Sequence, residues 1–125
     1  MKKIYILFLF LFQINNSLSQ EFKISVTAES RNDYKIIASD SNGNINNFDP
    51  DLIFNLGSKL IFEVNSPGHP FLIKYQPGVG KKNLIEEIEK NGLSKGIIEW
   101  EPKQKGTYYY QCVKHKNMVG KIIIQ

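Results

Sequence analysis

Short apolar runs alternate with turn-forming residues along most of the chain. From residue 22 to residue 28 the apolar positions, such as Phe22, Ile24 and Val26, alternate with polar ones, which is the period of a half-buried strand. Comparable runs predict further strands over residues 34–38, 71–75, 96–100, 107–112 and 119–125. About seven short strands separated by turns predict an all-β fold, a two-sheet Greek-key sandwich.

Two connecting segments carry more specific signals. Residues 39–47, with the sequence SDSNGNINN, are rich in Asn, Ser and Gly, which predicts a loop. Residues 52–56 and 59–64 are apolar runs on either side of a Gly-Ser pair. Two strand-like runs separated by so short a turn predict a hairpin.

One short helix is predicted near the middle of the chain. Asn83 is followed three residues later by Glu86, as in a capping box, and Gly92 is placed to end the helix. The apolar residues of this segment would lie on one helical face: Leu84, Ile85 and Ile88.

The N-terminus has the pattern of a secretory signal. It starts with Met-Lys-Lys, continues with nine apolar residues from 4 to 12, and reaches small residues before Ser19. We therefore expect a signal peptide over residues 1–19 and a single folded domain over residues 20–125, exported to the periplasm or secreted. The alternative is an uncleaved membrane anchor, but spanning a bilayer takes about 20 apolar residues, so no membrane span is expected in the mature chain.

The charge gives no reason to expect a nucleic-acid partner. The chain has 16 basic and 12 acidic residues and a formal net charge of +4. Removing the leader takes away two lysines and lowers the charge to +2, whereas nucleic-acid binding usually leaves a dense basic stripe. A monomer is the default expectation for a small domain of this kind.

The sulfur- and imidazole-bearing residues are few and concentrated. The chain has one cysteine and two histidines, and without the leader it has one methionine. An exported domain with one cysteine needs an explanation for that thiol: it is buried and inert, paired with another chain, or held by a metal. Cys112, His115 and Met118 lie within seven residues, and His69 is the only other imidazole.

This set of donors suits copper. Two imidazoles and a thiolate in a plane, with a weak axial thioether, form the copper site of electron-transfer proteins. The predicted ligands are therefore His69, Cys112, His115 and Met118, binding one ion that alternates between Cu(I) and Cu(II). Zinc is the weaker alternative, because structural zinc sites use Cys, His and carboxylate ligands rather than thioethers.

The segment around these residues, YQCVKHKNMVG over residues 110–120, resembles the copper loop of the cupredoxin family, the small blue (type 1) copper proteins that include plastocyanin and amicyanin. The resemblance covers roughly residues 50–125. It implies that His69, Cys112 and His115 are the strong ligands and Met118 the axial one. The chain departs from those relatives in having Pro70 after the first histidine, where they usually have Asn, and Lys114 as the second residue after the cysteine, where plastocyanin and amicyanin have Pro.

The resemblance implies a soluble one-electron carrier, not an enzyme. A copper-binding chaperone or storage protein of the cell envelope, without redox traffic, is the alternative. A catalytic copper site needs an open coordination position, which four ligands leave little room for. The expected partners are redox proteins, and Lys114 and Lys116 beside His115 would favour a partner with an acidic docking face.

Overall fold

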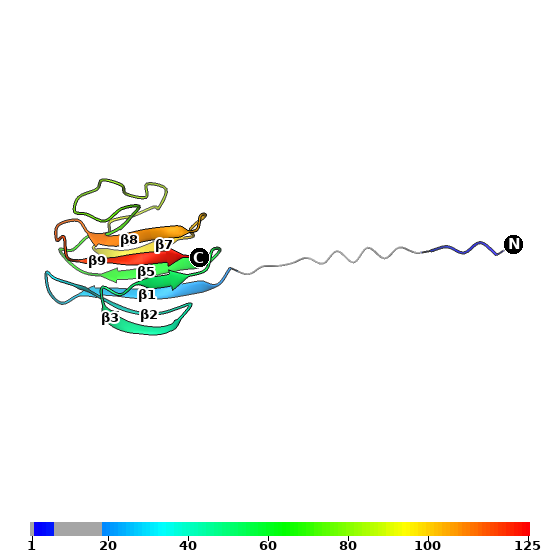
Figure 1. The fold of residues 1–125 in the computed structure, drawn as a ribbon, viewed down its shortest axis with the longest axis horizontal. Helices are drawn as coiled ribbons and strands as arrows, with labels where there is room; N and C mark the ends of the chain where they lie inside the picture. Colours follow the sequence, from blue (N-terminus) through cyan, green and yellow to red (C-terminus); the bar gives the residue numbers. More distant parts are fainter. Residues whose placement is uncertain (1, 7–18) are drawn as a thin grey trace.

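The computed structural model describes residues 2–6 and 19–125, and residues 19–125 form two β-sheets packed face to face (Figure 1). The strands, in chain order, are β1 (Glu21–Ala28), β2 (Tyr34–Asp40), β3 (Gly43–Phe48), β4 (Leu52–Phe54), β5 (Lys59–Asn65), β6 (Phe71–Lys74), β7 (Lys95–Trp100), β8 (Gly106–Cys112) and β9 (Val119–Ile124). One sheet has the order β3-β2-β1-β5-β7 and the other β4-β9-β8-β6. The predicted all-β, two-sheet sandwich is confirmed.

The predicted signal peptide falls mostly on residues that are not described. Residues 1 and 7–18 lie outside the described part of the chain, so the leader stays a prediction. Among residues 2–6 and 19–125, no helix has the length and hydrophobicity that crossing a bilayer requires.

Aromatic side chains from both sheets form the core between them. Phe22 of β1 packs on Phe54 of β4 with ring centroids 4.9 Å apart, and Phe62 of β5 packs on Phe71 of β6 at 5.4 Å. Burying a side chain of this size contributes roughly 1.5–3 kcal/mol. Tyr110, which strand alternation places in the core, is fully buried there.

Both sheets are mixed. Most neighbouring strands are antiparallel, but β1 pairs in parallel with β5, and β4 pairs in parallel with β9. The predicted hairpin over residues 52–56 and 59–64 is therefore wrong, because β4 and β5 belong to different sheets. The turn between them carries the chain across the sandwich. Leu56 N–H donates to the carbonyl of Gln125, just after β9, and Lys59 N–H donates to the carbonyl of Gln20, just before β1.

The loop predicted over residues 39–47 is largely strand. After the turn at Ser41 and Asn42, β3 pairs with β2, with Asp40 opposite Gly43. This strand forms the edge of its sheet and most of its side chains are exposed. Because the pairing is made by backbone groups, polar residues are sufficient there, and the composition alone does not distinguish such an edge strand from a loop.

The predicted short helix is also absent: residues 83–92 form a series of turns. They form isolated turn hydrogen bonds, such as Ile88 N–H to Ile85 C=O, and they also bond to β6 and to Tyr75, which follows it. Ile85 N–H donates to Ile73 C=O, and Tyr75 N–H donates to Asn83 C=O. The Asn91 side chain donates to Ile73 C=O and accepts from Ile73 N–H, both at 2.8 Å. The segment therefore covers the edge of β6, which would otherwise be open.

Candidate metal centre

Strand pairing explains why residues 43 positions apart meet. In the antiparallel pair of β6 and β8, Phe71 at the start of β6 lies opposite Cys112 at the end of β8. The turn that precedes β6 and the turn that follows β8 must therefore lie at the same end of the sheet. The first turn carries His69 and the second carries His115. This end of the sandwich is opposite to the C-terminus (Figure 1).

Three of the predicted ligands converge. The Cys112 sulfur lies 3.6 Å from Nδ1 of His115 and 3.8 Å from Nδ1 of His69. The ligand atoms of all three residues lie within 4.8 Å of one another. Metal–nitrogen and metal–sulfur bonds of about 2.0–2.3 Å, at the angles of a trigonal or tetrahedral site, separate the two atoms by roughly 3.6 Å. The spacing therefore fits one ion of first-row size.

The Cys112 sulfur is shielded from solvent, and the two imidazoles reach the surface. Cys112 is fully buried, whereas His69 and His115 are partly exposed. The pKa of His69 is lowered, first by its desolvation and then by the neighbouring His115, Lys114 and Arg31. A lowered pKa keeps the ring neutral, which is the form that binds a metal.

Met118 lies in the same loop. Its side chain is fully buried, and its backbone closes the loop: Cys112 N–H donates to Met118 C=O at 2.9 Å, and Met118 N–H donates to His115 C=O at 3.2 Å. The role of Met118 as the axial ligand stays a prediction.

Comparisons with known proteins identify the fold. No protein-family model matches the chain, and no curated protein matches it. Among solved structures, rusticyanin from Thiobacillus ferrooxidans matches with 21% identity and a TM-score of 0.60, over 86% of this chain and 79% of that one. A second rusticyanin structure, described as that of a copper protein, matches with 18% identity and a TM-score of 0.60, over 86% of this chain and 80% of that one. Reduced rusticyanin matches with 19% identity and a TM-score of 0.58, over 86% and 81%. The chain has the cupredoxin fold.

Within this cupredoxin fold, the turn that carries His69 is held by two hydroxyl groups. Ser66 Oγ donates to His69 C=O at 2.9 Å, and the Tyr34 hydroxyl lies 3.0 Å from the carbonyl oxygens of both His69 and Pro70. Burial, followed by the nearby Cys112, raises the pKa of Tyr34 far above its ordinary value, so the phenol stays a donor. Sequence reasoning missed both residues. The Ser-Pro-Gly turn signal could have indicated Ser66, but nothing local to Tyr34 connects it with a turn 35 residues away.

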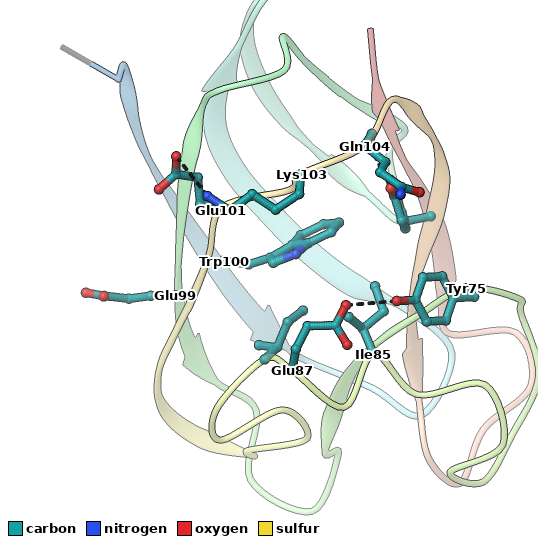
Figure 2. Close-up of a pocket in the computed structure, with 10 residues that line it drawn as sticks. Tyr75, Ile85, Glu87, Glu99, Trp100, Glu101, Lys103 and Gln104 are labelled. Carbon is teal, nitrogen blue, oxygen red and sulfur yellow. Dashed lines mark hydrogen bonds and ion pairs between the residues drawn. The ribbon is translucent and has the colours of Figure 1, made fainter. Parts of the chain in front are cut away.

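A separate groove of about 510 Å³ lies at the other end of β8 of the cupredoxin sandwich. Trp100 and Tyr108 are among its lining residues, and Glu87, which also lines it, accepts a hydrogen bond from Tyr75 (Figure 2). Tyr108 is four residues before Cys112 on the same strand, so the backbones of the two residues are about 13 Å apart at the rise of a strand. None of the predicted ligands lines it.

Proposed function

We propose that the chain binds one copper ion through His69, Cys112, His115 and Met118 and acts as a soluble one-electron carrier. The observation that carries the proposal is the placement of the Cys112 sulfur 3.6 and 3.8 Å from two imidazole nitrogens. The cupredoxin fold supports it, because the structural neighbours include a copper protein and a form described as reduced.

The donor set and its frame suit electron transfer. Copper bound there would supply the Cu(I)/Cu(II) couple, since thiolate and thioether favour Cu(I) and imidazole accepts both states. The chain's own contribution is to keep the donors in place. Cys112 is held by strand pairing with β6, and the His69 turn is held by Ser66 and Tyr34. Four ligands on a frame of this kind leave no position for a substrate, so we propose no catalytic activity.

The burial of Cys112 favours the carrier over the chaperone or storage alternative. A protein that delivers Cu(I) must present its sulfur to the recipient, but Cys112 has no exposed surface. The partly exposed His115 ring instead offers a partner a short path to the cluster. Lys114 and Lys116 are exposed on either side of it, which supports docking by a redox protein with an acidic face.

We further propose that residues 1–19 are a cleaved signal peptide and that the domain works as a monomer in the periplasm or outside the cell. In such compartments free thiols oxidise. A thiolate bound to copper, and buried as Cys112 is, would be protected from pairing with other thiols.

Cu(II) addition to the purified protein tests the proposal. We expect an intense blue thiolate-to-Cu(II) absorption band and a reversible reduction potential for the wild type, and no such band for Cys112→Ser. Met118→Leu should keep the band and shift the potential, because the axial ligand tunes it. A wild-type protein that binds Cu(II) without the band, or that keeps the band after Cys112→Ser, would refute the copper–thiolate assignment.

A further inference from the structure

Gln111 precedes the cysteine, and its side chain contacts the ligand loop, residues 113–118, from the interior of the domain. It is fully buried. Its Nε2 lies 3.1 Å from the carbonyl oxygen of Cys112, 3.0 Å from that of His115, 3.4 Å from that of Lys116 and 3.3 Å from that of Met118. An amide nitrogen has two hydrogens, so these four acceptors share two donors. One buried side chain therefore connects three of the predicted ligands and a residue between them.

The other end of the same amide is anchored. Gln111 Oε1 accepts a hydrogen bond from Gly78 N–H at 3.0 Å. The Gly78 carbonyl in turn accepts from the ammonium of Lys74, which also donates to Gly80 C=O at 3.0 Å. Lys74 is 1% exposed, and no salt bridge is found for it within residues 2–6 and 19–125.

A second connection runs beside this one. Gly80 N–H donates to the carbonyl of Val113 at 2.9 Å, and Val113 N–H donates to Pro70 C=O at 3.3 Å. The chain from 78 to 80 is therefore bonded to Lys74 on one side and to the ligand loop on the other. Both ends of the Gln111 amide are fixed, so the side chain cannot turn away from the loop without leaving buried polar groups unpaired, which is costly.

Backbone hydrogen bonds close the ligand loop, from Cys112 N–H to Met118 C=O and from Met118 N–H to His115 C=O, but they do not reach all of its carbonyl groups. The Lys116 carbonyl has no backbone donor among the described residues, and the exposed residues Lys114, Lys116 and Asn117 make up most of the loop between Cys112 and Met118. We infer that Gln111, anchored through Gly78 by Lys74, is a positioning residue that holds the 113–118 loop in its ligand-binding conformation before the metal arrives. The inference rests on the proposed copper function and adds to it a residue that touches no ligand atom.

Two substitutions of Gln111 separate the role of its amide nitrogen, the donor, from that of its amide oxygen, the acceptor. Gln111→Glu keeps the shape and the acceptor for Gly78 but turns a carboxylate oxygen toward four carbonyl oxygens. Gln111→Met keeps the length and removes both donor and acceptor. Gln104→Glu, at an exposed position, is the matched control for the first change. Lys74→Met removes the far anchor and leaves Gln111 intact, with the exposed Lys82→Met as its control.

The first measurement uses the copper-free protein. Hydrogen exchange at the backbone amides of residues 113–118 should become faster by about tenfold in both Gln111 variants, since each loses hydrogen bonds that hold the loop closed. Lys74→Met should change it in the same direction by a smaller factor, and both controls should match the wild type. Because no metal is present, this result does not depend on the copper proposal.

The second measurement uses Cu(II) in competition with a chelator, together with the reduction potential. Loss of a residue that orients ligands typically lowers metal affinity 10–100-fold, and we expect a loss in this range for Gln111→Met with a changed thiolate band and a shifted potential. A lower melting temperature with unchanged loop exchange, affinity and potential would show a general structural role and overturn the inference. If neither Gln111 variant folds, Lys74→Met decides: wild-type exchange and affinity in that variant would overturn it. A wild type without the blue band would instead refute the copper proposal, leaving the exchange result to decide on Gln111.

Discussion

Gly120 should not tolerate even a methyl group, and the reason lies in its partner across the sheet. Gly120 in β9 pairs with Tyr110 in β8, and the tyrosine ring lies over the glycine. A Cβ added at Gly120 would lie 2.6 Å from Cε1 of Tyr110 and closer still to Cζ and the hydroxyl oxygen. Since the φ angle of Gly120 is not in the left-handed region, the cost of Gly120→Ala is steric rather than conformational.

The ring has nowhere to move. Tyr110 is fully buried, stacks on Phe71 with centroids 5.4 Å apart, and donates its hydroxyl to Pro50 C=O. Overpacking a core of this kind costs about 1–3 kcal/mol, and leaving the buried hydroxyl unpaired costs about 1–3 kcal/mol more. We therefore expect Gly120→Ala to lower the free energy of unfolding by roughly 2–6 kcal/mol, which corresponds to a fall in Tm of roughly 10–30 °C for a domain of this size.

Urea unfolding of the copper-free protein measures the effect, and a double-mutant cycle with Tyr110→Leu tests its cause. On the Tyr110→Leu background the added methyl no longer meets a ring, so Gly120→Ala should cost less than about 1 kcal/mol. Lys121→Ala, at the next and exposed position of β9, controls for the change of residue in the strand. An equal cost of Gly120→Ala on both backgrounds would refute the steric account.

Two further predictions concern charge. Replacing Lys114 and Lys116 by glutamate should slow electron transfer with an acidic partner at low salt and have little effect at high salt, where charges are screened. Stopped-flow mixing measures the rate, and the double variant Lys81→Glu with Lys82→Glu is the control. A rate equal to that of the control would refute a docking role for Lys114 and Lys116. Burial raises the pKa of Asp49 from its ordinary value of 3.8 to about 7. Between pH 3.8 and about pH 7, the Asp49 carboxyl is therefore protonated in the folded state and ionised in the unfolded chain. The unfolding free energy of the copper-free protein should therefore fall as the pH rises through this window, and Asp49→Asn should flatten the slope; an equal slope in both proteins would contradict the assignment.

Individual strands could be predicted from the sequence because the alternation of apolar and polar residues is a local property. The inward positions of β1, such as Ile24 and Val26, are fully buried, as the pattern predicts. Which strands pair is not local. The runs of β4 and β5 look like a hairpin because only a few residues separate them, yet each pairs in parallel with a terminal strand, β9 or β1. No signal within residues 52–64 distinguishes a turn within a sheet from one that crosses between sheets.

The missing helix has a similar cause. Asn83 and Glu86 match a capping box, and the apolar residues that follow match a helical face. The same apolar residues, Ile85 and Ile88, are buried against the sandwich while the backbone bonds to β6. Asn83 and Lys90 have φ angles of 63° and 59°, which lie outside the helical region. Tertiary contacts therefore outweighed a weak local preference.

The candidate metal site could be predicted because the chain has very few thiol and imidazole side chains. One thiol and two imidazoles in the chain leave few ways to form such a cluster, and the structure brings all three together. Gln111 was not predictable in this way, because an amide becomes a positioning group only through its distances to particular carbonyls.

The residues of the candidate site are held in place in two ways. Cys112 and His69 are placed by strand register, which depends on backbone pairing and on an apolar face that many residues can form. The loop between Cys112 and Met118 has to be held by something else, and here the buried amide of Gln111 contacts its carbonyls, not its side chains. Contacts to backbone groups place no demand on the identity of the loop residues. Substitution of the exposed residues Lys114, Lys116 and Asn117 should therefore leave the positions of the donor atoms unchanged.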